Sequence, residues 1–265
     1  MTLGIIGGLG PLAGAHFYRR LTERTEANGD AEHISVILSG IPQIPDRTAF
    51  LLGKSAEDPT PYLVREAKRL ASAGADMLVL LCHTAHAFFP ALHASVSVPL
   101  LHLPRIALRA VAAHGYRRIG ILCTEGCYRA GVFSSASEGL PLEIFYPTHR
   151  ERATLNQLIY NGIKCGKADP CVAKLEIPPS FLEKEADVVL LGCTELSLLH
   201  PTSCRSGSPA FYRAPYITAD CVFADPLEIL AEVCIGLCGK RVKGEEYATW
   251  GTPFTFAERA PTEIC

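Results

Sequence analysis

The chain has no marked excess of either charge and no long hydrophobic run. Its 265 residues carry 25 Lys and Arg against 27 Asp and Glu, for a formal net charge of −2 at pH 7. That balance gives no reason to expect nucleic acid or an anionic membrane as a partner. No apolar run approaches the ~20 residues that a membrane-spanning helix needs. The N-terminus lacks a basic segment before its apolar stretch, so we expect no signal peptide and a cytoplasmic location.

Motifs for several common cofactors are also missing. The chain has no Gly-Lys-Ser/Thr, which excludes a P-loop. Its 11 cysteines are an odd number in a long chain without an export signal, so we expect free thiols rather than a disulfide scaffold. Cys123 and Cys127, or Cys234 and Cys238, are spaced like half of a metal site, but neither pair has a matching second pair. The sequence therefore predicts no metal.

The composition is ordinary for a soluble globular protein, with 48% hydrophobic and 20% charged residues, and the length allows one large domain or two small ones. Strand and helix patterns alternate, which predicts an α/β fold with mainly parallel sheets. The expected strands are residues 3–6, 34–38, 77–81, 119–123, 188–191 and a last one near 216–218. The expected helices are 11–26, 61–72, a short one after Cys82 that Pro90 limits, 105–113, 153–163 and 226–237.

Two segments resemble each other, and each contains a cysteine. Residues 74–84 and 185–195 both read Ala-Asp, five mostly apolar residues and Cys, with Thr at or next to the following position. This repetition indicates a duplicated fold. Cys82 and Cys193 then follow equivalent buried strands, at the sheet edge where ligands bind in open α/β proteins.

A glycine loop follows the first expected strand. Gly8-Leu9-Gly10-Pro11-Leu12-Ala13 fits the dinucleotide fingerprint G-x-G-x-x-G/A. However, the second strand ends in Ser39-Gly40 rather than an acid that would hold a ribose, and Pro11 lacks the N–H that a pyrophosphate would need. We favour a tight turn that brings backbone N–H groups near a small anion, with Pro11 beginning the helix. A turn without a ligand is the alternative.

The two cysteines suggest proton transfer. A cysteine at a strand-to-helix turn feels the positive end of the helix, which lowers its pKa and favours thiolate. No recognisable motif places His and Asn or Asp partners, so hydrolysis of the papain type is not supported. Two facing thiols suit a different task, in which one removes a proton from a carbon and the other delivers one to the opposite face. For either cysteine alone, a buried structural role is the alternative.

Several motifs, in order, resemble the aspartate racemase branch of the aspartate/glutamate racemase superfamily over about residues 3–235. They are Gly4-Ile5-Ile6-Gly7-Gly8-Leu9-Gly10-Pro11, Ile44-Pro45-Asp46-Arg47-Thr48, Cys82-His83-Thr84-Ala85-His86, Gly120-Ile121-Leu122-Cys123-Thr124-Glu125-Gly126, Ile163-Lys164 and Leu191-Gly192-Cys193-Thr194-Glu195.

The resemblance implies two pseudo-symmetric α/β domains, each a mainly parallel sheet flanked by helices, with the active site in the cleft between them. It also implies a small amino-acid substrate, a two-base mechanism without a cofactor and, commonly, a homodimer. We expect residues 1–100 with about 215–238 to form the first domain and 101–214 the second. The tail, residues 239–265, is rich in Gly, Pro and charge, so we expect it to be extended or loosely packed.

The resemblance also assigns residues. Cys82 and Cys193 match the acid/base pair, and Arg47 and Lys164 match cations that hold substrate carboxylates, a task that suits a bidentate guanidinium and a point-charge ammonium. Thr84 and Thr194 either cap the following helices or donate to a carboxylate. The other predicted substrate-binding residues are Gly8, Gly10, His83, Thr124, Cys127 and Glu195.

Two of these positions depart from the family pattern. His83 replaces the usual Asn after the first cysteine, and Cys127 replaces a usual Thr. Both changes bear on substrate recognition, because they alter the available donors and acceptors. Glu195 follows the aspartate branch, since glutamate racemases usually have His there.

These observations favour a cofactor-independent amino-acid racemase, with aspartate as the first expected substrate. A racemase or isomerase for glutamate, a hydantoin or another small acid is the second hypothesis, motivated by His83 and Cys127. A non-catalytic protein that binds a small acid is the third.

Overall fold

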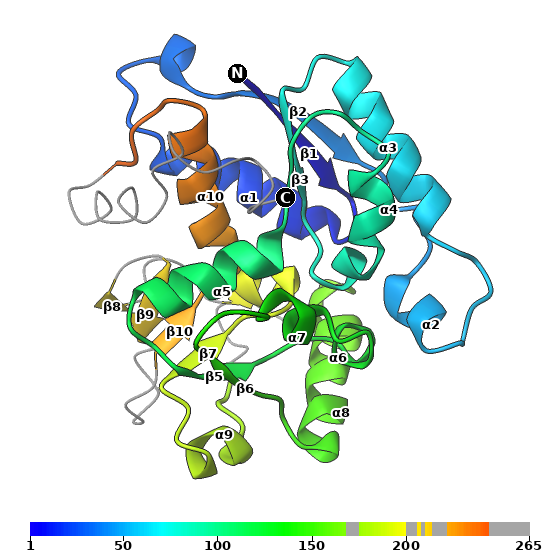
Figure 1. The fold of residues 1–265 in the computed structure, drawn as a ribbon, viewed down its shortest axis with the longest axis vertical. Coiled ribbons are helices and arrows are strands. Elements are labelled where there is room, and N and C mark those ends of the chain that lie inside the picture. The colour runs from blue at the N-terminus through cyan, green and yellow to red at the C-terminus, as the bar shows by residue number, and fades with distance from the viewer. Residues whose placement is uncertain (168–174, 200–205, 208–209, 214–221, 244–265) are drawn as a thin grey trace.

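The computed structural model describes residues 1–167, 175–199, 206–207, 210–213 and 222–243 (Figure 1). The first sheet is parallel throughout and has the strand order β2-β1-β3-β4. Its strands are β1 (Thr2–Gly7), β2 (Ser35–Gly40), β3 (Met77–Leu80) and β4 (Leu100–Leu101).

The second sheet repeats this arrangement. Its parallel part has the order β6-β5-β7-β10, which matches β2-β1-β3-β4 position by position. Two short antiparallel strands extend its edge. The strands are β5 (Arg118–Ile121), β6 (Glu143–Phe145), β7 (Val188–Leu190), β8 (Ser206–Gly207), β9 (Phe211–Arg213) and β10 (Val222–Ala224). The predicted α/β fold with a duplicated, mainly parallel sheet is confirmed.

Helices flank both sheets. The α-helices are α1 (Pro11–Arg24), α2 (Arg47–Leu51), α3 (Thr60–Ser72), α4 (Phe89–His93), α5 (Leu103–Ala113), α6 (Glu125–Arg129), α7 (Val132–Ala136), α8 (His149–Gln157), α9 (Pro179–Glu183) and α10 (Pro226–Leu237). The short 3₁₀ and π helices are η1 (Asp30–Glu32), η2 (Thr84–Phe88), η3 (Leu158–Ile163) and η4 (Thr194–Leu199). Among the described residues, no helix combines the length and apolar character needed to cross a membrane.

Alternate side chains of the central strands enter different cores, as in a sheet covered on both faces. Ile6 and Leu80 pack toward α3, where Leu63, Ala67 and Leu70 are buried as their helical spacing predicts.

The opposite face of the first sheet belongs to a core that the second sheet shares. Ile5 of β1 and Ile121 of β5 are fully buried in the same cluster, together with residues of α1, α5 and α10. Helix α10 contacts both α1 and α5, and Figure 1 shows α5 and α10 between the two sheets. This helical layer fixes the position of one sheet relative to the other.

Two helical segments differ from the sequence prediction. Helix α8 begins at His149, earlier than expected, because Thr148 and Glu151 form a capping box, and the segment predicted as one helix continues as the π-helical η3. After Cys82 the chain forms η2 and then α4, with Pro90 in the first turn of α4. Pro90 therefore begins a helix rather than limiting one, since its missing N–H is not needed there.

The end of the chain is described only in part. The strand predicted near residues 216–218 lies outside the described residues, as do residues 244–265 of the predicted tail. Strand β10 pairs with β7 in the second sheet, whereas α10 has the predicted bounds and packs on α1. The domain boundaries given above therefore remain a prediction.

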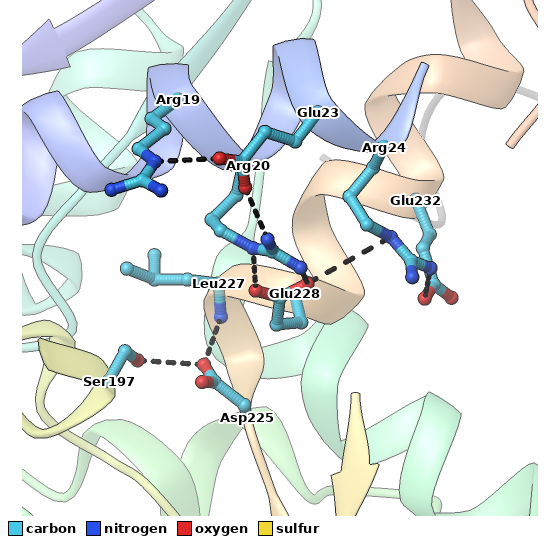
Figure 2. Close-up of polar contacts among 9 residues, drawn as sticks. All are labelled: Arg19, Arg20, Glu23, Arg24, Ser197, Asp225, Leu227, Glu228 and Glu232. Atoms are coloured by element: carbon cyan, nitrogen blue, oxygen red, sulfur yellow. Dashed lines mark hydrogen bonds and ion pairs between the residues drawn. The ribbon is translucent and has the colours of Figure 1, made fainter. Parts of the chain in front are cut away.

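Buried charges join α1 to α10 inside the shared helical layer (Figure 2). Arg20 Nε donates to Glu228 Oε1, and Arg24 Nη2 donates to Glu232 Oε1, each at 2.5 Å. All four side chains are at most 9% exposed. Because a buried ion is costly unless paired, this cluster specifies how the two helices pack.

Asp225 extends the connection toward the second cysteine. It caps α10 by accepting from Leu227 N at 3.1 Å and also accepts from Ser197 Oγ at 2.7 Å (Figure 2). Ser197 belongs to η4, which begins directly after Cys193. Helix α10 thus contacts both the helix after the glycine loop and the turn after Cys193.

Within this cluster, only one of the two carboxyl oxygens of Glu232 accepts a hydrogen bond. Its Oε2 is buried and accepts no hydrogen bond. Burial raises the pKa of Glu232 to about 8, and the charge of Glu228 adds to this rise, while Arg24 opposes it. The native protein therefore holds a proton at Glu232 that the unfolded chain releases at lower pH.

We predict that Glu232→Gln removes a pH dependence of stability. A carboxyl whose pKa is raised on folding contributes stability that is fully present below its unfolded pKa and is lost as the pH rises through its folded pKa. The free energy of unfolding of the native chain should therefore fall between about pH 5 and pH 8. Urea unfolding at pH 5 and pH 9 should show similar stabilities at pH 5 and a more stable variant at pH 9. Equal losses for both proteins would contradict this account.

Candidate active site

Cys82 and Cys193 reach the same place from equivalent positions in the two halves. Cys82 follows β3 and Cys193 follows β7. Both are buried, with 8% and 6% exposure, and both line one small chamber. The chamber has a volume of about 10 Å³, which is room for roughly one water molecule. The two thiols therefore face a common space that is nearly free of solvent.

Most of the predicted site residues surround this chamber. Its lining consists of Arg47, Thr48, Cys82, His83, Thr84, Thr124, Tyr160, Lys164, Cys193, Thr194 and Glu195. The sequence analysis did not single out Thr48 and Tyr160. Helical spacing offered a signal for Tyr160, which lies four residues before Lys164, and Thr48 directly follows Arg47.

A larger cavity, here called the vestibule, lies beside the chamber. Its volume is about 290 Å³. It is lined by Gly8, Leu9, Gly10, Pro11, Leu12, Ala13, Pro42, Ile44, Asp46, Arg47, Ile163, Lys164, Glu195 and Leu198. Arg47, Lys164 and Glu195 line both cavities, so they form the boundary between them. Cys127 lines neither cavity and is buried in the shared core.

The glycine loop is shaped by close contacts with its neighbours. Gly8 has φ of +82°, and a Cβ there would collide with the backbone of Ile41, so only glycine fits. A Cβ on Gly10 would overlap the carboxylate of Glu195. Pro11 begins α1 as predicted. The anion that approaches this loop in the described structure is thus the chain's own Glu195.

Three N–H groups of the Arg47 guanidinium donate to backbone carbonyls. Its Nη1 donates to the carbonyls of Ile44 and Pro45 at 3.1 and 3.0 Å, and its Nη2 donates to Leu9 O at 2.8 Å. These bonds tie the loop before α2 to the glycine loop. The buried Nε has no partner, and Nη2 uses one of its two N–H groups, so two adjacent N–H groups remain available to a carboxylate.

Glu195 connects three parts of the site. Its Oε2 accepts from Cys193 Sγ at 2.9 Å and from Thr194 Oγ1 at 3.1 Å. Its Oε1 lies 3.7 Å from Lys164 Nζ, which also sits 4.6 Å from the ring centre of Tyr160. Burial opposes the charge on Lys164, but Glu195 and the thiols outweigh it and raise the pKa of Lys164. Lys164 is therefore charged and paired.

The electrostatics at Cys193 differ from the sequence expectation. We expected the positive end of a following helix to lower the thiol pKa. Burial instead raises the pKa of Cys193 well above its usual value, and the Glu195 charge adds to the rise, while Lys164 offsets part of it. The helix that follows is only the short 3₁₀ helix η4, so its dipole is too weak to prevail.

A row of hydroxyls crosses the chamber. Thr84 Oγ1 lies 2.8 Å from Thr124 Oγ1, which accepts from Thr48 Oγ1 at 3.3 Å. Thr124 also caps α6 by accepting from Cys127 N. Thr84 makes no such capping bond to η2. The hydroxyls therefore join α2, η2 and α6 at the site.

Two histidines flank Cys82. His86 Nδ1 bonds to Cys82 O at 2.9 Å, and its Nε2 accepts from Leu103 N at 3.1 Å, so Nδ1 carries the proton and the ring is neutral. Burial lowers the pKa of His86 well below its usual value. His86 thereby fixes the backbone of Cys82 against the start of α5.

Unlike His86, His83 is buried without a hydrogen-bond partner for its ring nitrogens. It is 1% exposed and stacks on Phe133 with 5.2 Å between ring centres. Burial lowers its pKa to about 3, helped by the charge of His102. Neither ring nitrogen has a hydrogen-bond partner. His83 therefore offers the chamber one donor and one acceptor.

The unpartnered atoms around the chamber form a complementary set. Arg47 Nε is a donor, Glu195 Oε1 is an acceptor that lacks a hydrogen bond, and neutral His83 supplies one of each. Such buried atoms are costly unless a ligand satisfies them. Together they match one carboxylate and one ammonium.

The cysteines in the described part of the chain are all free thiols, as expected for these residues. The described residues also contain no group of three or more His, Cys, Asp or Glu that is arranged to hold a metal ion.

Comparisons with known proteins add to this geometry. A family model described as Asp/Glu/Hydantoin racemase matches residues 6–209. The chain is 21% identical over 201 residues to the broad specificity amino-acid racemase RacX of Bacillus subtilis, an alignment that covers 74% of this chain and 86% of that protein.

Solved structures show that the fold is shared. The aspartate racemase of Picrophilus torridus matches with a TM-score of 0.68 and 24% identity, covering 93% of this chain and 97% of that one. An aspartate racemase homologue from Pyrococcus horikoshii matches with a TM-score of 0.67 and 23% identity, covering 90% of this chain and 99% of that one. Because the family model spans most of the chain, the protein belongs to the Asp/Glu/Hydantoin racemase family and is an isomerase of the racemase type.

Proposed function

We propose that this chain is a cofactor-independent amino-acid racemase in which Cys82 and Cys193 exchange the α-proton. The observation that carries the proposal is the chamber itself. Two thiols from equivalent strand ends line it, and the unpartnered atoms of Arg47, His83 and Glu195 beside them suit the head group of an amino acid.

In one direction Cys82 acts as the base and Cys193 as the acid. The raised pKa of Cys193 supports this assignment, since it keeps that thiol protonated at neutral pH. The Cys82 thiolate takes the α-proton, the C–H electron pair remains on carbon, and the S–H proton of Cys193 is delivered to the opposite face. The reverse reaction exchanges the two roles.

The surroundings favour the developing carbanion. An amino-acid α-proton is weakly acidic, so negative charge that spreads into the substrate carboxylate must be stabilised. Arg47 Nε, the Thr84 and Thr124 hydroxyls and the charged Lys164 lie around the chamber as donors. The small chamber excludes bulk water, which strengthens each of these interactions.

Aspartate is the substrate that the motif resemblance favours, and glutamate, a hydantoin or another small acid is the alternative. A hydantoin would meet the Glu195 carboxylate with a neutral ring N–H rather than an ammonium group, so the charge of Glu195 favours a free amino acid. A binding protein without activity would not require two thiols in one chamber. A cytoplasmic location and a homodimer complete the proposal, and both come from the sequence and its family resemblance.

Replacement of either thiol tests the mechanism. We predict that Cys82→Ala and Cys193→Ala each lower racemisation in both directions by about 10²-fold or more, since a positioned acid or base contributes about that factor. Chiral chromatography of L- and D-aspartate incubations measures the rates. Cys238→Ala, at the end of α10 and away from the chamber, is the matched control and should retain native activity. A single-cysteine variant with native rates in both directions would refute the proposal.

The role of Glu195 is separately measurable. We predict that Glu195→Gln shifts the alkylation midpoint of Cys193 to lower pH, because a negative charge that disfavours the thiolate is removed. Lys164→Met should shift it to higher pH. Peptide-resolved mass spectrometry after brief iodoacetamide treatment gives both midpoints. Shifts of the same sign in the two variants would show that these charges do not set the state of Cys193.

A further inference from the structure

The vestibule lies where a substrate side chain would extend. It meets the chamber at Arg47, Lys164 and Glu195, which line both spaces. The chamber, at about 10 Å³, has room for roughly one water molecule, whereas the vestibule has about 290 Å³. A substituent on a carbon held between the thiols therefore has the vestibule as its available space.

The donors at this boundary suffice for one carboxylate. Among the described lining residues, the permanent positive charges are those of Arg47 and Lys164. Three backbone carbonyls occupy both terminal nitrogens of Arg47, which leaves Nε without a partner. Lys164 already faces Glu195. The Nε–H and the second Nη2 N–H of Arg47 suffice for the α-carboxylate, whereas the other cation, Lys164, is already paired with Glu195.

Charge in the vestibule also disfavours a second carboxylate. Asp46 lines it and already accepts from Ala49 N at 2.7 Å and from the Tyr160 hydroxyl at 3.3 Å. Asp46 and Glu195 balance the two cations. Burying an unpaired carboxylate beside Asp46 would cost several kcal/mol or more.

The vestibule walls are mainly apolar. Leu9, Pro11, Leu12, Ile44, Ile163 and Leu198 contribute to them. Leu12, in the first turn of α1, is 59% exposed and therefore available to contact a ligand. An apolar ligand group that covered these walls would be stabilised in proportion to the apolar surface removed from water.

We infer that the vestibule is the side-chain subsite and that it takes an uncharged, largely apolar side chain in preference to a second carboxylate. The inference rests on the proposed racemase function and changes its expected substrate class from dicarboxylic to apolar amino acids. The head group keeps its contacts with Arg47, His83 and Glu195, and the side chain replaces water against the apolar walls.

A substrate panel tests this preference. The purified full chain is incubated in deuterated water with L-leucine, L-methionine, L-alanine, L-lysine or L-aspartate, and NMR follows loss of the α-hydrogen signal. We expect kcat/KM for leucine and methionine to exceed that for aspartate by about tenfold or more, a ratio within reach of one hydrophobic pocket.

A variant on the vestibule wall and a matched control elsewhere test whether the substrate preference arises in the vestibule. Leu12→Asp places a charge on the vestibule wall and should lower kcat/KM for leucine about tenfold, while alanine, whose methyl group is short, should change less than about twofold. Leu182→Asp makes the same replacement at another exposed leucine, on α9 and outside both cavities. It should leave both substrates unaffected.

The outcomes separate the two proposals. If aspartate or lysine is the best substrate, or if Leu12→Asp does not distinguish leucine from alanine, the side-chain inference is overturned and the racemase function stands. If no amino acid exchanges its α-hydrogen while the thiols are reduced, the racemase proposal itself fails, and the inference fails with it.

Discussion

The site depends on a core that both sheets share. The inner faces of β1 and β5 are buried in one cluster with α1, α5 and α10, and the Arg20–Glu228 ion pair and the Arg24–Glu232 hydrogen bond between α1 and α10 fix the packing of that layer. Because the sheets have the same strand order, equivalent turns after β3 and β7 meet across the chamber. Neither sheet alone could place thiols on two sides of one carbon, so duplication and the shared core together make the two-base arrangement possible.

Within that frame, the Glu195 carboxylate organises the chemistry. It accepts from Cys193, faces Lys164 and requires the absence of a side chain at Gly10. The buried Glu195 carboxylate thus favours the protonated form of Cys193 and pairs with Lys164. Its position also explains why residue 10, in a loop from the other half of the chain, is a glycine. The Oε1 of Glu195, beside Gly10 and Lys164, accepts no hydrogen bond, and an ammonium group at the boundary of the two cavities would satisfy it.

Much of this was predictable from sequence, and the failures have physical causes. Period and turn residues located β1, β2, β3, β5, β7 and the α10 bounds, and repetition identified Cys82 and Cys193 as equivalent, whereas the short strands β4, β6, β8, β9 and β10 were not predicted. The expected lowering of the Cys193 thiol pKa was wrong because burial, together with the charge of Glu195 two residues along the chain, outweighed the effect of the helix end. The sequence did not show that Arg47, predicted to hold a carboxylate, also donates three of its N–H groups to backbone carbonyls. A single sequence carries no signal for such competition between local chemistry and tertiary partners. It also does not show which residues form the vestibule walls.

The most direct test of the central claim is where deuterium appears early in the reaction. One enantiomer of a turned-over amino acid is incubated with the enzyme in deuterated water, and both enantiomers are separated and analysed at low conversion. Two thiols on opposite faces predict deuterium at the α-carbon of the product enantiomer, with almost none in the remaining substrate. Equal labelling of both enantiomers would indicate a single base serving both faces and would contradict the account.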